Sequence, residues 1–263
     1  MQILVINLPE SKDRLDFQQK QLDRMGLDYE IIRAVSTSYV HERVHHHLTL
    51  GWNRPLLRTE IACYFSHHKI WQMVVKRSQP ALVLEDDALL SRHVPALLEA
   101  LDNRNDLDIV NFEVHGNRKT VGKTAQTLLG EYKLLPLYQD PIGAAGYVIW
   151  PSGAKKLLEK AKTVPSGPAD EFISVTYELN KYQLEPAAVI QLDQCEHYEV
   201  INRIKTRTTI DPKEEQEVYV SLTDKLKFRQ RRLSSGFKAM MYQMSIKSSS
   251  ITRNIALNPD DFL

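Results

Sequence analysis

This chain of 263 residues has few cysteines, no long apolar run and almost no net charge. Its two cysteines, Cys63 and Cys195, lie far apart and form no Cys-x-x-Cys pair, which argues against a disulfide scaffold and a structural zinc site. The net charge of +1 gives no overall attraction to nucleic acid. No stretch approaches the roughly 18–20 apolar residues of a transmembrane helix, so none is predicted.

The amino terminus also lacks the features of a signal peptide. No basic leader precedes its short apolar run, Gln2–Leu8, and we interpret this run as the first strand of the fold. We therefore expect a cytoplasmic protein, with any membrane association being peripheral. The length and the apolar fraction of 43% suit one large α/β domain, or one domain with an appendage.

The first 34 residues predict a β-α-β unit. The strand Gln2–Leu8 is followed by helical spacing over Ser11–Met25, and then by a second strand at Tyr29–Ala34. Such a unit predicts an α/β fold with a parallel, helix-covered sheet. Further helices are predicted at 59–77, capped by Thr59, at 94–101, at 152–162, capped by Ser152, and from Ala169. Strands are predicted at 108–113, 132–137 and 184–192, the last of these as the final core strand, with a surface excursion or hairpin at 116–130.

Three consecutive histidines, His45–His47, lie within the segment 36–58. Adjacent histidines point in different directions on either a strand or a helix, so a single metal ion rarely binds all three. We predict a mobile, polar loop on the substrate side instead.

The segment Glu85-Asp86-Asp87 follows a short apolar run bounded by Pro80, which predicts a buried strand ending in three carboxylates. Three adjacent anions repel one another, so we expect a positive group beside them. Mg²⁺ and Mn²⁺ favour oxygen ligands and often bind through carboxylates and substrate phosphates. Because ligands of open α/β sheets bind beyond the carboxyl ends of strands, the triplet predicts a metal–diphosphate site. The alternative is a polar loop in which one Asp caps a helix.

Other carboxylates also lie at the ends of predicted elements. Asp170 and Glu171 fall in the first turn of a helix, where the helix dipole alone favours them, and Glu113 ends a strand. The small residues 143–146 allow the backbone to pass close to a ligand, with tight strand packing as the alternative.

The character of the chain changes beyond about Thr209. The region 225–247 interleaves basic residues with large apolar ones, a pattern suited to an anionic membrane surface. A helix that packs on the main domain is the competing interpretation. RNA binding is less favoured, because no stacking platform accompanies the charge.

Taken in order, several segments resemble glycosyltransferase family 25, which includes bacterial lipooligosaccharide galactosyltransferases and the collagen galactosyltransferases. The resemblance covers residues 2–195, whereas the segment 36–58 and the carboxyl-terminal tail match no family pattern. The segments are Ile6-Asn7-Leu8, Asp13-Arg14, Thr59–His67 with Trp71, Leu84–Asp87, Gly143–Ile149 and Pro168-Ala169-Asp170.

This resemblance implies a GT-A-type catalytic domain over residues 1–208, a Rossmann-like mixed sheet flanked by helices, followed by a helical, basic extension at 209–263. It implies a UDP-sugar donor, most simply UDP-galactose, an Mn²⁺ or Mg²⁺ cofactor, and a β-galactoside formed with inversion. The implied acceptor is a lipooligosaccharide or lipopolysaccharide saccharide. Such an acceptor is lipid-linked, which would place the enzyme at the inner face of the bacterial inner membrane.

The resemblance also assigns roles to residues. Asp87, with Glu85 or Asp86 assisting, would hold the metal and so stabilise the departing diphosphate. Asp170 matches the family element and is the preferred general base, with Glu171 and Glu113 as alternatives. Residues expected on the donor side, each with a structural role as the alternative, are Asn7, Arg14, Glu60, Ser66, His67, Glu85 and Asp86.

Two other functions remain open at this point. A sugar- or nucleotide-binding protein that kept the fold and lost catalysis is the first, although the presence of both acidic elements argues against it. A metal-dependent hydrolase is the second, and the lack of a Ser nucleophile elbow or an HExxH motif weakens it.

Overall fold

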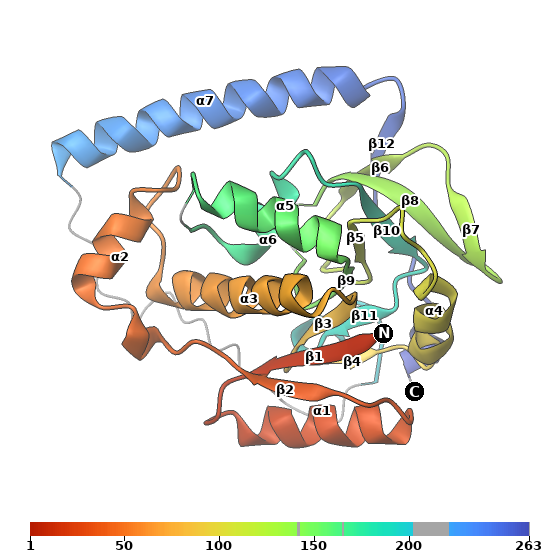
Figure 1. Ribbon diagram of the computed structural model, residues 1–263. Coiled ribbons are helices and arrows are strands. Elements are labelled where there is room, and N and C mark those ends of the chain that lie inside the picture. Colours follow the sequence, from red (N-terminus) through yellow and green to blue (C-terminus); the bar gives the residue numbers. More distant parts are fainter. Residues whose placement is uncertain (141–142, 165, 202–220, 263) are drawn as a thin grey trace.

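The computed structural model describes residues 1–140, 143–164, 166–201 and 221–262 (Figure 1). At its centre is a mixed sheet in the order β12-β6-β8-β10-β5-β9-β3-β1-β2, with β7 paired to β8, while β11 and β4 form a separate pair. The strands are β1 (Gln2–Asn7), β2 (Glu30–Arg33), β3 (Ala81–Glu85), β4 (Ala88–Leu90), β5 (Ile109–Asn111), β6 (Lys119–Gly122), β7 (Gln126–Leu129), β8 (Tyr132–Gln139), β9 (Gly146–Ile149), β10 (Lys181–Glu185), β11 (Val189–Gln191) and β12 (Ser250–Arg253).

Helices cover both faces of this sheet (Figure 1). They are α1 (Lys12–Arg24), α2 (Glu42–Thr49), α3 (Arg58–Arg77), α4 (Val94–Leu101), α5 (Pro151–Ala161), α6 (Ala169–Ser174) and α7 (Leu222–Ile246), with short 3-10 helices η1 (Thr37–Tyr39), η2 (Leu192–Gln194) and η3 (Pro259–Phe262). The predicted β-α-β start is confirmed, because β1 pairs in parallel with β2 and with β3. Since β9 runs antiparallel between β3 and β5, the sheet is mixed, and the predicted α/β class is confirmed.

The alternation of side chains along β1 divides the core into two layers. Leu4 and Ile6 pack with α3, α5 and α6 on one face, whereas Ile3 and Val5 pack with α1 and α4 on the other. A strand buried on both faces needs apolar residues at every position, which explains the uninterrupted run at the amino terminus.

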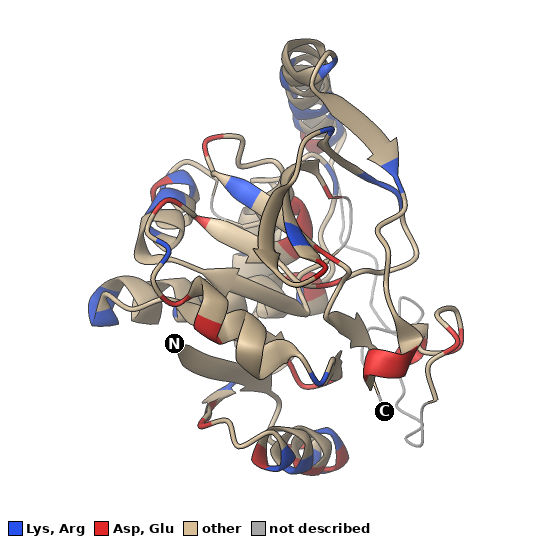
Figure 2. Cartoon of the chain, turned by 90° about the vertical axis from the view of Figure 1, so that its right-hand side faces the viewer, with Lys and Arg blue, Asp and Glu red and all other residues tan. Residues whose placement is uncertain are grey.

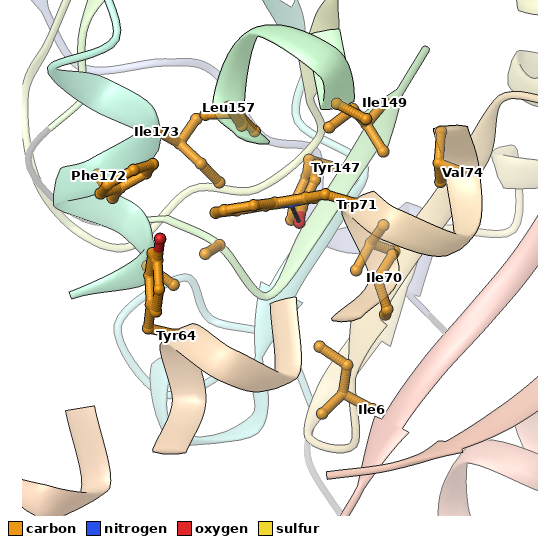
Figure 3. Packing of buried hydrophobic residues seen from close by; sticks show 14 of the residues in the cluster. Ile6, Tyr64, Ile70, Trp71, Val74, Tyr147, Ile149, Leu157, Phe172 and Ile173 are labelled. Carbon is orange, nitrogen blue, oxygen red and sulfur yellow. Dashed lines mark hydrogen bonds between the residues drawn. The ribbon is translucent and has the colours of Figure 1, made fainter. Parts of the chain in front are cut away.

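The face that carries α3 contains a cluster of aromatic rings (Figure 3). Trp71 stacks on Phe172 with ring centroids 5.8 Å apart, and Tyr64 meets both rings edge-on. The hydroxyl of Tyr147, on β9, accepts a hydrogen bond from Trp71 Nε1 at 3.0 Å. This cluster joins α3, α6 and β9, the elements that carry several of the predicted site residues.

The prediction of a mobile loop around the three histidines was wrong, because His45–His47 lie within α2. His45, Leu48 and Thr49 are buried and share one face of this helix, at the spacing of three and four residues that places side chains together. His45 Nε2 lies 2.6 Å from the carbonyl oxygen of Leu56. Burial of this face accounts for the helix.

Several boundaries also differ from those predicted. The cap of α3 is Leu57, whose N–H donates to Glu60 Oε2 at 2.8 Å, so the predicted capping by Thr59 was wrong. Ser152 lies inside α5, whose cap is Trp150. The predicted strand 184–192 is divided between β10 and β11. In the excursion at 116–130, β6 and β7 each pair with β8 and not with one another.

The carboxyl-terminal residues return to the sheet after the helix α7. β12 pairs antiparallel with β6 at the edge of the sheet, so a partly exposed strand follows the predicted final core strand at 184–192. Asp261 contacts Arg92, His93 and the hydroxyl of Tyr132. Among the described residues, the helices include none whose length and apolar character would let it cross a membrane.

Candidate active site

The strand β3 ends at Glu85, and the turn that follows it carries Asp86 and Asp87. Glu85 lies on the α3 side, where its Oε1 is 3.2 Å from His67 Nε2 and 3.8 Å from Cys63 Sγ. Asp86 turns to the α1 side, where Asn7 Nδ2 donates to it at 2.8 Å. Glu85 and Asp86 therefore lie on opposite sides of the sheet, which reduces the repulsion between these two carboxylates.

Arg14 is a positive group beside the triplet. Its Nη1 lies 3.0 Å from Asp86 Oδ1 and 3.0 Å from Asp87 Oδ2, so one guanidinium bridges two carboxylates. Burial raises the pKa of Asp87 to about 7, and the charge of Glu85 adds to this while Arg14 opposes it. One guanidinium therefore does not fully offset the burial of these carboxylates.

The second carboxylate oxygen of Asp87 is suited to bind a metal cation. Asp87 Oδ1 is buried and has no hydrogen-bond partner among the described residues. A buried carboxylate oxygen without a partner is uncommon, and such oxygens are the ligands that Mn²⁺ and Mg²⁺ prefer. Asp87, with Glu85 close enough for its charge to raise the pKa of Asp87, therefore suits the predicted metal site.

A second set of possible metal ligands, which includes a thiol and an imidazole, lies beside the acidic triplet. Cys63, His67 and Glu85 bring a thiol, an imidazole and a carboxylate within 4.8 Å of one another. Sequence reasoning did not select Cys63, although its spacing of four residues from His67 on α3 places the two on one helix face. Burial and the charges of Glu85 and Asp170 raise the pKa of this thiol well above its usual value.

His67 is held from both ring nitrogens. Its Nδ1 lies 3.0 Å from the hydroxyl of Tyr147, which also accepts from Trp71, and its Nε2 faces Glu85. His67 and Glu85 thus form a continuous polar chain with the aromatic cluster. Burial would raise the pKa of Glu85, but His67, Arg14 and Cys63 together outweigh it and lower that pKa.

Asp170 opens α6 and lines a small cavity, together with Asn111, Asp140, Tyr147 and Lys181. The cavity measures about 20 Å³, enough for one water molecule. Burial raises the pKa of Asp170 to about 6, the N–H of Glu171 lowers it, and the charges of Glu171 and Glu85 raise it. Asp170 is therefore near enough to Glu85 to sense its charge.

The two other candidate bases have different surroundings. Glu113 is 1% exposed, and its Oε2 accepts from the N–H of Ala145 at 2.7 Å. Burial raises the pKa of Glu113 well above its usual value, although Lys119 opposes this. Glu171 instead accepts from Trp52 Nε1 at 3.2 Å and from Arg54 at 3.3 Å.

The predicted donor-side residues divide into two groups. Asn7, Arg14 and His67 contact the acidic triplet directly. Glu60 binds both terminal nitrogens of Arg54, at 2.9 and 2.7 Å, and caps α3. Ser66 accepts from the N–H of Val35 at 2.8 Å and so fastens α3 to the end of β2.

Sequence reasoning missed Trp52, Arg54 and Tyr147 as neighbours of the site. Trp52 and Arg54 follow α2 in the segment 36–58, for which the sequence predicted only a polar loop. Tyr147 was within the small-residue strand, but only the packing of β9 against α3 reveals its contact with His67.

Comparisons with known proteins agree on one family. The model of "Glycosyltransferase family 25 (LPS biosynthesis protein)" matches residues 1–173. A lipooligosaccharide biosynthesis protein of Haemophilus influenzae is 26% identical over 210 residues, which cover 72% of this chain and 76% of that protein. Procollagen galactosyltransferase 2 of Homo sapiens is 28% identical over 197 residues, 67% of this chain and 30% of the relative.

Procollagen galactosyltransferase 1-A of Xenopus laevis is 26% identical over 197 residues, 67% of this chain and 31% of the relative, so the match spans less than a third of these procollagen enzymes. Among solved structures, a Drosophila β-1,4-galactosyltransferase 7 variant with manganese, UDP-Gal and xylobiose is similar at a TM-score of 0.37 and 10% identity. That similarity covers 81% of this chain and 77% of the other. On the strength of the family model, this chain belongs to glycosyltransferase family 25.

Proposed function

We propose that this protein is a metal-dependent, inverting galactosyltransferase that transfers galactose from UDP-galactose to a lipooligosaccharide or lipopolysaccharide saccharide. The observation that carries the proposal is the grouping of Glu85, Asp87 and Asp170, in which the charge of Glu85 raises the pKa values of both Asp87 and Asp170. The names of the procollagen and lipooligosaccharide relatives support the choice of galactose and of the acceptor.

On the donor side, Asp87 and Glu85 would hold Mn²⁺ or Mg²⁺. When bound, this ion neutralises negative charge on the diphosphate that departs. Arg14 positions Asp86 and Asp87, since one nitrogen of its guanidinium contacts both. Asn7 fixes the other oxygen of Asp86, and His67 fixes Glu85. These contacts keep the carboxylates in place before the donor binds, which favours electrostatic catalysis.

On the acceptor side, Asp170 would take the proton from the attacking hydroxyl. A base with a pKa near the working pH is well matched to this task, and burial raises the pKa of Asp170 to about 6. Glu113 is almost fully buried and binds the backbone of Ala145, and Glu171 is engaged by Trp52 and Arg54. These contacts favour Asp170 over the two alternatives.

We further propose that residues 1–208 form the catalytic domain and that residues 209–263 extend it. A lipid-linked acceptor would bring this cytoplasmic enzyme to the inner face of the bacterial inner membrane as a peripheral protein. Residues 202–220, which include the proposed boundary, lie outside the described part of the chain.

The test is a screen of UDP-sugars with Mn²⁺ and a lipooligosaccharide acceptor, with the product linkage determined by NMR. We expect galactose transfer with a β linkage, abolished by chelation and by Asp87→Asn. Asp23→Asn, an exposed change on α1, is the matched control and should retain activity. Equal turnover with and without metal, and in Asp87→Asn, would contradict the metal assignment. Binding of UDP-galactose without any transfer would instead identify a binding protein.

A further inference from the structure

The helix α7 presents large apolar side chains to solvent along one line. They are 48% to 79% exposed. Their spacing of three, four or seven residues places them on a single face of a helix. We call this face the outer stripe: Leu222, Leu226, Leu233, Phe237, Met240 and Met244.

The opposite face of the same helix packs on the domain. Phe228 and Ile246 are buried, and Tyr242 stacks on Tyr177 with ring centroids 4.2 Å apart. Arg231 and Arg232 donate to the carbonyl oxygens of Gly51 and Asn53. Packing on the domain therefore explains the apolar residues on the inner face of α7. It does not explain the exposed apolar residues of the outer stripe.

The charge of α7 identifies the partner that suits this stripe. The helix contains six basic residues and a single acidic one, Asp224, which is buried. Figure 2 shows the blue of Lys and Arg along this helix, at the top of the view. The basic side chains are exposed. Lys225 and Arg229 flank one edge of the stripe, and Lys227 and Lys238 lie toward the other. Large apolar side chains between cations match an anionic bilayer surface, which accepts apolar groups and attracts positive charge.

A second copy of the chain is a poorer match. The outer stripe repeats at the spacing of a coiled-coil seam, but the positions that border it carry Lys227 and Arg229 and no carboxylate. Pairing two α7 helices would thus bring like charges together without an opposite charge to balance them.

We infer that the outer stripe of α7 is a membrane-docking surface for anionic phospholipid, with the stripe inserted among the acyl chains and the flanking cations at the headgroups. This inference rests on the proposed function for its biological purpose, because a lipid-linked acceptor lies at a membrane. The contacts of the inner face of α7 give a geometric reason for docking through this helix. The loop that Arg231 and Arg232 hold also carries Trp52 and Arg54, which bind Glu171 beside Asp170. Docking through α7 would place this side of the site near the bilayer.

The experiment is cosedimentation of the full chain with vesicles of phosphatidylcholine, alone or mixed with phosphatidylglycerol, and without any saccharide acceptor. We expect binding to the anionic vesicles at low salt and release at high salt, because the Debye length shortens as salt increases. The double variant Leu233→Ser/Phe237→Ser should lower the partition coefficient at least tenfold, since two large apolar groups no longer leave water. Lys225→Gln/Arg229→Gln should lower the partition coefficient about thirtyfold, at low salt only, because each cation contributes about 1 kcal/mol.

Tyr39→Ser is the matched control, because Tyr39 is 64% exposed on η1, outside α7. It should bind vesicles like the unaltered chain. Equal binding by the Leu233→Ser/Phe237→Ser variant, or no binding to anionic vesicles at low salt, would overturn the inference. So would a dimer that dissociates in this variant, with no vesicle binding by either protein. Binding of UDP-galactose, measured separately by calorimetry, tests the proposed function and is independent of these outcomes.

Discussion

Two buried tyrosines of the aromatic cluster offer a direct test of how the site is supported. Tyr147 and Tyr64 are both fully buried and lie close to Trp71 (Figure 3). The hydroxyl of Tyr147 accepts from Trp71 Nε1 and contacts His67 Nδ1, each at 3.0 Å. The hydroxyl of Tyr64 has no hydrogen-bond partner among the described residues. The same change, Tyr to Phe, should therefore have opposite consequences at the two positions.

The magnitude follows from the partners that lose a contact. In Tyr147→Phe, the N–H of Trp71 and the Nδ1 of His67 remain buried without a partner, since both side chains are inaccessible to solvent. Each such group costs about 1–3 kcal/mol, so the free energy of unfolding should fall by about 2–6 kcal/mol. Tyr64→Phe removes an unpaired hydroxyl and should leave that free energy unchanged or raise it by about 1 kcal/mol.

Urea unfolding of the two variants and the unaltered chain measures the difference. In thermal unfolding, each kcal/mol corresponds to about 2–4 °C for a protein of roughly this size, so Tyr147→Phe should unfold at least several degrees lower. The slope of free energy against urea concentration should be the same in all three proteins. Equal midpoints for Tyr147→Phe and Tyr64→Phe would refute the reasoning, because the hydrogen bonds of Tyr147 would then contribute nothing.

Two further predictions concern the proposed base and a close backbone contact. Asp170→Asn should reduce turnover by about 10²–10⁴-fold while donor binding survives. In the unaltered enzyme kcat/KM should decline below pH 6, since the base acts deprotonated and its pKa is about 6. Near-normal turnover in Asp170→Asn, with collapse in Glu171→Gln or Glu113→Gln, would transfer the role. Gly153→Ala should destabilise the fold, because a Cβ there would collide with the backbone carbonyl of Asp108. Gly236→Ala, on α7, adds a Cβ that meets no atom within 4 Å, and it should stabilise the fold by about 0.5–1 kcal/mol. Equal unfolding midpoints for the two variants would contradict both expectations.

The sequence predicted those features that depend on local periodicity. The start β1-α1-β2, the helix α4 and the acidic end of β3 all follow from apolar spacing and were found where expected. A short segment of sequence also shows that Glu85, Asp86 and Asp87 must be neutralised. It does not show that Arg14, more than seventy residues away, supplies part of the positive charge. That contact depends on how α1 crosses β3, which local pattern does not encode.

Other features depend on tertiary packing and were beyond prediction. The burial of His45 in α2 rests on its contact with Leu56, and the role of Glu60 rests on Arg54. Polar residues of this kind have the same appearance in a sequence whether they bind a ligand or support the fold. The return of β12 to β6 likewise pairs segments about 130 residues apart, and a strand of four residues has too short a pattern to specify its partner.

The pairing of β12 with β6 also has a mechanical consequence for the helix that precedes it. α7 is not a free tail: β12 fastens its carboxyl end, and His46 and the Gly51–Asn53 loop hold its amino half. Because α7 is held at both ends, it cannot rotate about its own axis. The outer stripe therefore cannot turn toward the domain when no partner is present. It stays exposed in that state, and it should favour self-association and adsorption to surfaces at high protein concentration.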